Sequence, residues 1–202
     1  MSSKKIDSQT RTRILEAALT LIVRRGGADV TMAEIAGAAR VSRQAVYLHF
    51  ADRADLLIAL ARFADEKRNL QAAIQRLKDA PTGVAALHEM AALQARMNPR
   101  IWAIARAFDA VRRVDEAAER SWQDRLNHRW EGCRQIVSRM EAEGTLRPGL
   151  DARTATDLLW TLTSLRTWED LALQKGWTAR RYEQRMTEML LAGLTHSNSD
   201  HS

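Results

Sequence analysis

The chain has 202 residues, of which 46% are hydrophobic and 28% are charged, and its formal net charge is +6 at pH 7. This length can hold a small domain and a larger helical body, the apolar fraction suffices for buried cores, and the positive charge favours polyanionic partners. The single cysteine, Cys133, excludes an internal disulfide and argues against a thiolate metal cluster.

The N-terminus and the apolar runs bear on localisation. The first residues lack the apolar core of a secretion signal, and no run reaches the roughly eighteen apolar residues of a membrane span. We therefore expect a cytoplasmic protein. Cys133 lies on a predicted apolar helix face, which favours a buried structural thiol over a redox switch.

Residues 31–57 are predicted to form two short helices around a tight turn, followed by the start of a third. The first begins at Thr31, whose hydroxyl can accept a hydrogen bond from the Glu34 amide while the Glu34 carboxylate reaches the Thr31 amide. Ser42 can cap the second helix. This is the layout of a DNA-binding helix-turn-helix.

The second helix is expected to bury Val46 and Phe50, which lie four residues apart. The residues off this stripe are Arg43, Gln44, Tyr47 and His49. Arginine can donate two hydrogen bonds to guanine and glutamine can pair with adenine in the major groove, while tyrosine, histidine and the following Arg53 can reach phosphates. The alternative is that the aromatic residues only pack and the arginines are only solvated.

The ordered set resembles the TetR (tetracycline-repressor-like) family of bacterial transcription regulators, in which a threonine-opened helix, an Ala-Gly-Val-Ser turn and a recognition helix ending in Tyr-x-His-Phe follow one another. The corresponding residues here are Ala39, Arg40, Val41, Ser42, Val46, Tyr47, Leu48, His49, Phe50 and Arg53. The match extends back through a first helix with Arg11, Ile14, Leu15, Ala17, Ala18 and Leu19, ending at Gly26. Such a long match is far more specific than a single motif.

The resemblance implies a role for each matching position. Base-edge candidates are Arg43, Gln44 and Tyr47, and candidates for contacts with the DNA backbone are Thr31, Ser42, His49 and Arg53. Arg40 stands where the family usually has glycine, and positive φ costs a non-glycine residue on the order of 1 kcal/mol. We therefore expect a slightly strained or differently wound turn.

Lys4 and Lys5 lie in a polar segment that is expected to precede the first helix. They could contact the DNA backbone or the minor groove as a basic arm. The alternative is a disordered tail with incidental charge.

The rest of the chain is helical in pattern, so we expect an all-α fold. Expected helices cover about residues 53–79, 82–97, 99–112, 115–143, 151–175 and 178–195. With the three helices of the DNA-binding domain this gives about nine, the number that the resemblance implies. The predicted domains are a helix-turn-helix domain at 1–55 with a basic arm, and a helical regulatory and dimerisation domain at 56–202.

The last two helices carry apolar stripes that predict a homodimer. The stripes consist of Leu158, Leu159, Leu162 and Leu165, and of Tyr182, Met186, Met189, Leu190 and Leu194. Two such helices can pair with their copies as a four-helix bundle, and the resemblance implies this interface. The alternative is that both stripes close the monomer's own core.

Six tryptophans, all after residue 100, favour a flat apolar or cationic ligand in the helical body. The candidate ligand-binding residues are Trp102, Trp130, Trp160, Thr163 and Thr167. The alternative is a packing role, as the helical spacing of Trp122, Leu126, Trp130 and Cys133 indicates.

Catalytic patterns are incomplete. His88 and Glu89 begin like a zinc-protease helix, but the second histidine is missing, and Asp124 and His128 have no evident third metal ligand. There is neither a phosphate loop nor a serine elbow. We expect no enzyme activity, no metal and no cofactor.

The resulting hypothesis is a homodimeric regulator, expected to be a repressor, that binds a palindromic operator in double-stranded DNA and is released by a small-molecule inducer, aromatic or apolar. An alternative is a DNA-binding organiser or regulator controlled by a protein partner. A third, less favoured, is a helical enzyme or carrier that keeps the helix-turn-helix as scaffold.

Overall fold

The computed structural model describes residues 2–27, 29–67 and 69–196, with side chains from residue 7 onward. Within these ranges every regular element is a helix, apart from one isolated bridge between Leu146 and Thr195, so the predicted all-α fold is confirmed. Among the helices described, none is both long and apolar enough to cross a membrane.

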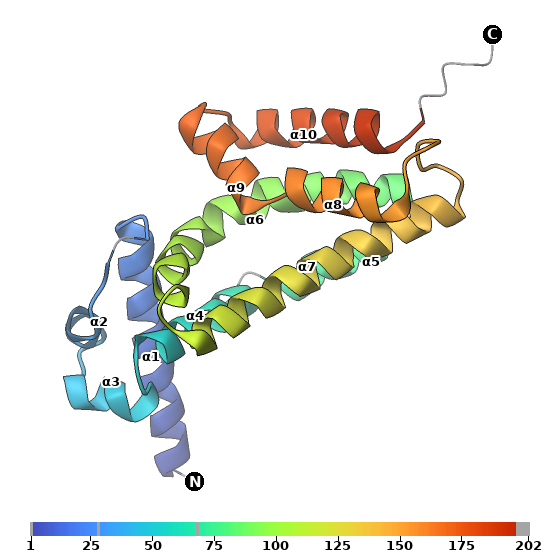
Figure 1. Cartoon of the computed structure of the whole chain (residues 1–202). Helices are drawn as coiled ribbons and strands as arrows, with labels where there is room; N and C mark the ends of the chain where they lie inside the picture. The colour runs from blue at the N-terminus through green and yellow to red at the C-terminus, as the bar shows by residue number, and fades with distance from the viewer. Residues whose placement is uncertain (1, 28, 68, 197–202) are drawn as a thin grey trace. The chain divides into compact units, whose positions relative to one another are not determined.

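In the described part of the chain, ten α-helices and one π-helix follow one another (Figure 1). They are α1 (Ser2–Arg24), α2 (Met32–Ala39), α3 (Arg43–His49), α4 (Arg53–Lys67), α5 (Leu70–Lys78), α6 (Gly83–Arg112), α7 (Glu116–Ala142), α8 (Ala152–Leu162), α9 (Leu165–Trp168), the π-helix η1 (Glu169–Gln174) and α10 (Ala179–Leu194).

Three expected helix boundaries differ from the structure. Asn98 and Pro99 were expected to separate two helices, but α6 runs through both, since a proline within a helix removes one backbone hydrogen bond and the rest of the ladder can continue. The expected helix 53–79 is divided near Asn69, which has a φ of 51°. The expected helix 151–175 ends at Leu162, and Ser164 caps a new helix by accepting from the Thr167 amide.

The helices form two compact units. The first consists of Met1–Leu70 and Ile101–Asp124, and the second of Gln71–Arg100 and Arg125–Ser202. This division differs from the expected boundary after residue 55, because α4 and the last part of α6 share the core of the helix-turn-helix. Apolar periodicity marks helix faces, but it does not say which helix each face meets.

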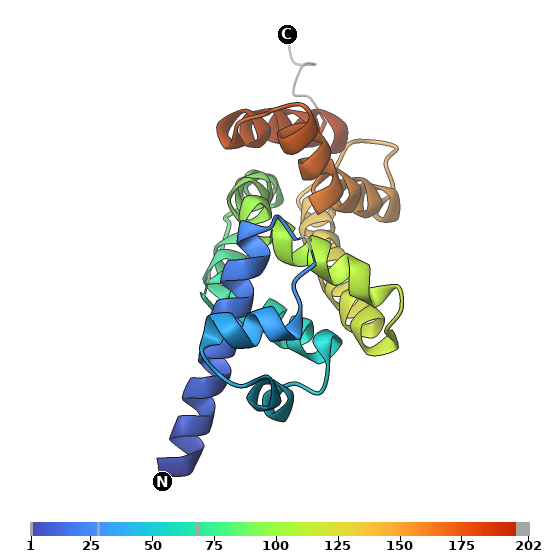
Figure 2. The same ribbon diagram turned by 90° about the vertical axis from the view of Figure 1, so that its left-hand side faces the viewer.

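In the first unit, α1 packs against α2, α3 and α4 (Figure 2). The core includes Ile14, Leu15, Ile35, Val46, Leu56, Leu60, Ala107 and Phe108. The backbone of Gly27, which has a φ of +78°, lies close to α6. A Cβ at this position would be only 2.5 Å from the Ala103 carbonyl oxygen. The turn after α1 therefore requires glycine both for its conformation and for space.

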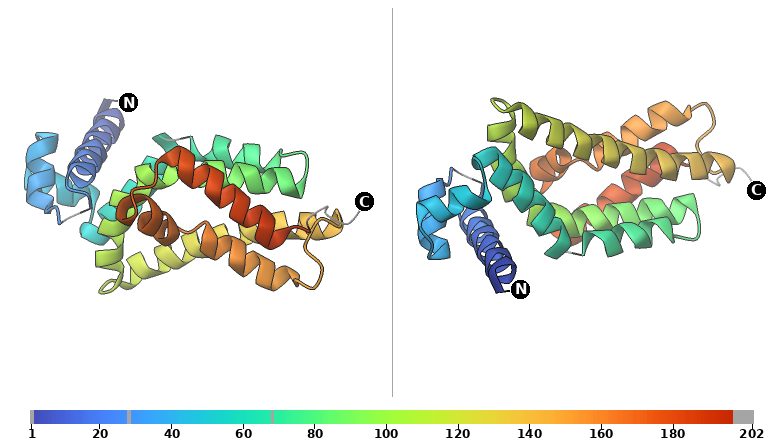
Figure 3. Two further views of the ribbon diagram at one scale, coloured as in Figure 1. Left: turned by 90° about the horizontal axis from the view of Figure 1, so that it is seen from above. Right: turned by 90° about the horizontal axis from the view of Figure 1, so that it is seen from below.

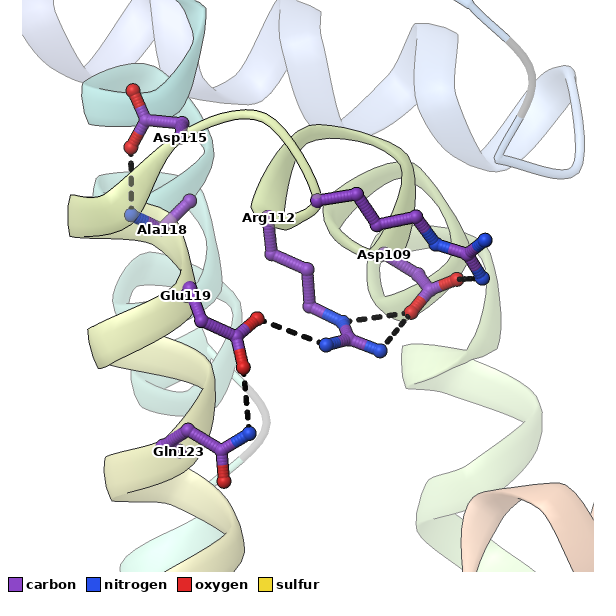
Figure 4. A network of polar contacts seen from close by, with 7 residues as sticks. Asp109, Arg112, Asp115, Ala118, Glu119 and Gln123 are labelled. Carbon is purple, nitrogen blue, oxygen red and sulfur yellow. Dashed lines mark hydrogen bonds and ion pairs between the residues drawn. The ribbon is translucent and has the colours of Figure 1, made fainter.

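A polar network joins α6 to α7 in the first unit (Figure 4). Arg112 Nε donates to Asp109 at 2.7 Å, and Arg112 Nη1 donates to Glu119 of α7 at 2.9 Å. At the start of α7, the Ala118 amide donates to the Asp115 carboxylate at 2.8 Å. The corner between the two helices is thus held by charged side chains from both sides.

In the second unit, the start of α6 packs closely on the end of α7. A Cβ on Gly83 would lie 2.5 Å from Met140 Cγ, and the Gly83 amide donates to the Glu143 carboxylate at 2.8 Å. Helices α8 and α10 lie beside each other (Figure 3). Cys133 is fully buried, as expected for a structural thiol, and burial raises its pKa to about 11.

Candidate DNA-binding site

The N-terminus of α2 has the predicted cap. Thr31 Oγ1 accepts from the Glu34 amide at 3.2 Å, and the Glu34 carboxylate accepts from the Thr31 amide at 2.8 Å. Arg25 Nη2 also donates to Glu34 at 2.6 Å. These contacts, that of Arg25 first, lower the pKa of Glu34 to about 2, so the charged carboxylate fixes α2 to the end of α1.

The turn between α2 and α3 is wound at Arg40, which has φ 54° and ψ 48°, in the left-handed region. Its amide donates to Ala36 and Gly37 carbonyls, and the Val41 amide donates to the Ala36 carbonyl at 3.0 Å. Arg40 therefore adopts the positive φ from which strain at this non-glycine residue is expected. Ser42 then begins α3 by accepting from the Ala45 amide at 3.0 Å.

One face of helix α3 is buried and the opposite face is exposed. Val46 and Phe50 are buried in the core of the first unit, as predicted, while Arg43, Gln44 and Tyr47 are exposed. The Arg43 guanidinium lies over the Tyr47 ring, 5.6 Å from its centroid. The three residues predicted to contact base edges are therefore exposed on the same short helix, where a DNA major groove could reach them.

Two predicted phosphate contacts have partners within the chain. His49 is only 10% exposed and lies 3.6 Å from the Asp7 carboxylate, so little of its ring can meet DNA. Arg53 is paired with Asp29 on the segment before α2. A phosphate that binds Arg53 must compete with this carboxylate, which is exposed and so readily displaced.

The predicted basic arm differs from the structure. Helix α1 begins at Ser2, so Lys4 and Lys5 belong to its first turns and do not precede it. No proline or glycine interrupts residues 2–24, and such a sequence can extend the helix toward the N-terminus. The side chains of both lysines lie outside the described part of the chain.

Sequence reasoning missed Leu48, which is 81% exposed on α3 between Tyr47 and His49. An exposed apolar side chain on a recognition helix can contact the methyl group of thymine. The sequence carried no clear signal for this residue, because a single exposed leucine on a helix is common in folded proteins.

The predicted ligand-binding residues are divided between the two units. Trp102 belongs to the first, where Arg106 lies over its ring and Gly26 packs against it. In the second unit, Trp130 Nε1 donates to Asp157 at 2.8 Å, and the Thr167 hydroxyl donates to the Thr161 carbonyl at 2.9 Å. Both contacts join two helices, Trp130 of α7 to α8 and Thr167 of α9 to α8.

Trp160 and Thr163 lie together in the second unit beside Arg129. The Arg129 guanidinium stacks over the Trp160 ring, 4.6 Å from its centroid, and donates to the Thr163 hydroxyl at 3.2 Å. Thr163 is buried and donates in turn to the Leu159 carbonyl at 2.6 Å. Sequence reasoning missed Arg129, because an arginine on a charged helix gives no sign of facing inward.

The apolar stripes predicted to mediate dimerisation are mostly buried within the second unit. Leu159, Tyr182, Met186, Leu190 and Leu194 are all 0% exposed. Leu158 and Met189 remain 41% exposed, on the outer faces of α8 and α10. Five of the nine stripe residues thus close the monomer's own core, which was the alternative, while Leu158 and Met189 remain exposed.

Comparison with known proteins places the helix-turn-helix in a family. Residues 14–60 match the model described as bacterial regulatory proteins, tetR family. The chain is 44% identical over 69 residues to the HTH-type transcriptional repressor BepR of Brucella suis, covering 33% of each protein. The match thus spans about a third or less of the length of BepR and of the HTH-type transcriptional regulator TtgR of Pseudomonas putida.

Solved structures resemble nearly the whole chain. A transcriptional regulator from Saccharomonospora viridis in complex with choline has a TM-score of 0.80 at 19% identity, covering 94% of this chain and 100% of that one. AibR in complex with isovaleryl coenzyme A and operator DNA has a TM-score of 0.68 at 21% identity, covering 90% and 98%. At these identities the likeness establishes the fold.

Proposed function

We propose that the chain, whose residues 14–60 match the tetR family of bacterial regulatory proteins, binds operator DNA as a transcriptional regulator, acting as a repressor in the cytoplasm without catalytic activity. The exposed face of α3 carries the proposal. Arg43, Gln44 and Tyr47 project from a helix that the buried Val46 and Phe50 hold in place, and all five lie within the matched residues 14–60.

Selection of bound sequences from random duplex DNA tests the proposal. We expect a short inverted repeat whose affinity falls steeply with salt, because phosphate contacts release counterions. Arg43→Ala should weaken binding to the selected site by about 1–3 kcal/mol and relax preference at one base pair, whereas Arg53→Ala should weaken binding to all sequences alike.

The exposed arginine Arg153 of α8, outside the helix-turn-helix, is the matched control. Arg153→Ala should leave both affinity and preference unchanged. If neither Arg43→Ala nor Arg53→Ala changed affinity for the selected sequence, α3 would not be the recognition helix.

A homodimer is part of the proposal. The exposed Leu158 and Met189 lie on neighbouring helices α8 and α10, which supports an interface between two copies of the second unit. Two recognition helices meet successive major grooves when their centres are ~34–36 Å apart, so a dimer would select a palindrome.

Release by a small molecule completes the proposal. The structural neighbours from Saccharomonospora viridis and AibR were solved with choline and with isovaleryl coenzyme A, which supports a ligand-controlled regulator over one controlled by a protein partner. A ligand changes operator affinity only if it binds the DNA-competent and the released conformations unequally.

A further inference from the structure

Polar side chains from four helices lie together in the second unit, two of them buried and two half-buried. The buried residues are Asn98 of α6 and Tyr182 of α10, and the half-buried ones are Arg129 of α7 and Trp160 of α8; Figure 1 shows these four helices. Arg129 links them, because it contacts Trp160 directly and its charge acts on the Tyr182 phenol.

Arg129 is a cation without an acidic partner. Its guanidinium donates to the Trp160 carbonyl at 2.7 Å and to the Thr163 hydroxyl at 3.2 Å, and both acceptors are neutral. In the described part of the second unit no carboxylate is paired with it, and burial lowers its pKa. A desolvated charge without a counterion is costly, so an anion brought to this point would be strongly favoured.

Three polar atoms of the cluster have no hydrogen-bond partner, namely Asn98 Nδ2, Trp160 Nε1 and the Tyr182 hydroxyl. Asn98 is 1% exposed and Tyr182 is 0% exposed, so bulk water does not satisfy them. Burial raises the pKa of Tyr182 to about 12, while the charge of Arg129 and the nearby Asn98 amide oppose this rise. The Asn98 amide nitrogen and the Tyr182 hydroxyl lie near each other without forming a hydrogen bond. All three atoms can donate.

We propose that this cluster binds a small organic acid, whose carboxylate pairs with Arg129 and accepts hydrogen bonds from Tyr182 and Asn98. One cation and several neutral donors match a single negative charge, and a guanidinium can hold a carboxylate through two parallel bonds. A phosphate dianion would leave a second negative charge without a partner. The Trp160 ring offers an apolar surface for the body of the acid.

Two features allow the core to open for this ligand. The π-helix η1 contacts α10, which carries Tyr182, and π-helices are rare segments that occur mainly at functional sites. Met186 is fully buried one turn after Tyr182. Methionine side chains are flexible and repack readily around an inserted group.

The test compares two acids with their neutral amides, using the full-length protein. Binding of phenylacetate, hexanoate, phenylacetamide and hexanamide is measured by calorimetry and by the shift in Tm. We expect at least one acid to bind, with an affinity about 10-fold to 100-fold above that of its amide, because the amide lacks the charge that pairs with Arg129.

Arg129→Met should reduce affinity for the acid to that for the amide, while Arg153→Met, at the exposed arginine of α8, should leave it unchanged. Tyr182→Phe keeps the shape of the core and should weaken acid binding by about 3-fold to 10-fold, so the test holds even if Arg129→Met does not fold. Binding of neither acid, equal binding of acid and amide, or acid binding insensitive to Tyr182→Phe and Arg129→Met would overturn the proposal.

This inference rests on the proposed function in making the acid the effector of a DNA-binding regulator, and the two can fail separately. Enrichment of an operator without acid binding would refute only the acid site. Acid binding without any enrichment of DNA would refute only the regulator.

Discussion

Arg40 occupies the left-handed conformation at the turn between α2 and α3, where a Cβ is unfavourable. Arg40→Gly is expected to raise the free energy of unfolding by about 0.5–1 kcal/mol, since glycine adopts positive φ without this penalty. Urea denaturation measures the change. Arg24→Gly, in the last turn of α1, should lower the stability by a similar amount; a loss of stability in Arg40→Gly would contradict the strain at this turn.

The local interactions of the site were predictable from the sequence and the distant ones were not. The Thr31–Glu34 cap, the Ser42 cap and the burial of Val46 and Phe50 depend on residues three or four positions apart. The pairing of Arg53 with Asp29 and the covering of His49 join residues far apart in sequence, as does the meeting of Asn98, Arg129 and Tyr182. Such contacts depend on the rotation of each helix about its axis, which periodicity alone does not define.

At the scale of the element, the cap of α2 makes the helix-turn-helix sensitive to acid. The folded-state pKa of Glu34 is lowered to about 2 from an ordinary value of 4.5, so the folded state favours the charged form. The stabilisation from the charged Glu34 is therefore fully present at pH values above 4.5, and it is lost as the pH falls from 4.5 toward 2. Glu34→Gln should lower Tm at pH 7 and flatten the dependence of Tm on pH within the window.

Glu66→Gln, at an exposed glutamate of α4, is the control for this experiment and should retain the wild-type pH profile. Calorimetry at a series of pH values gives both profiles. An unchanged profile in Glu34→Gln would mean that another carboxylate governs the acid sensitivity.

The sequence predicted which segments are helical more reliably than it predicted where each helix begins and ends. The apolar spacing predicted α7 and α10 to within a few residues, because their termini coincide with turn residues around Gly144 and Gly176. The continuity of α6 through Pro99 and the division at Asn69 were not predicted, since packing on neighbouring helices can override local preference in either direction.

At the scale of the whole molecule, the proposed dimer makes a separate prediction. Met189→Glu, on the exposed face of α10, should weaken self-association by about 10-fold to 100-fold, because the twofold axis brings like charges together. Sedimentation measures association, and affinity for the selected palindrome should fall with it. The helical circular dichroism spectrum should be unchanged.

Val114→Glu, at the 88% exposed residue between α6 and α7, is the matched control and should associate like the wild type. If Met189→Glu remained dimeric, the interface would lie elsewhere on the chain.

The chain passes between its two units three times, and two of these passages lie inside the helices α6 and α7. Asn98 lies in the second unit on the same helix as Arg112, which ties α6 to α7 in the first unit through Asp109 and Glu119 (Figure 4). Asn98 and Arg112 are joined by one continuous helix, whose backbone hydrogen bonds are interrupted only by the proline nitrogen of Pro99 between these two residues. The rotation of side chains about the axis of α6 is equally constrained. One residue inserted after Arg100 would rotate the following part of the helix by about 100° about this axis. In the proposed ligand-controlled regulator, the number of residues between Asn98 and Arg112 would therefore be constrained, whereas the length of a loop would be free to vary.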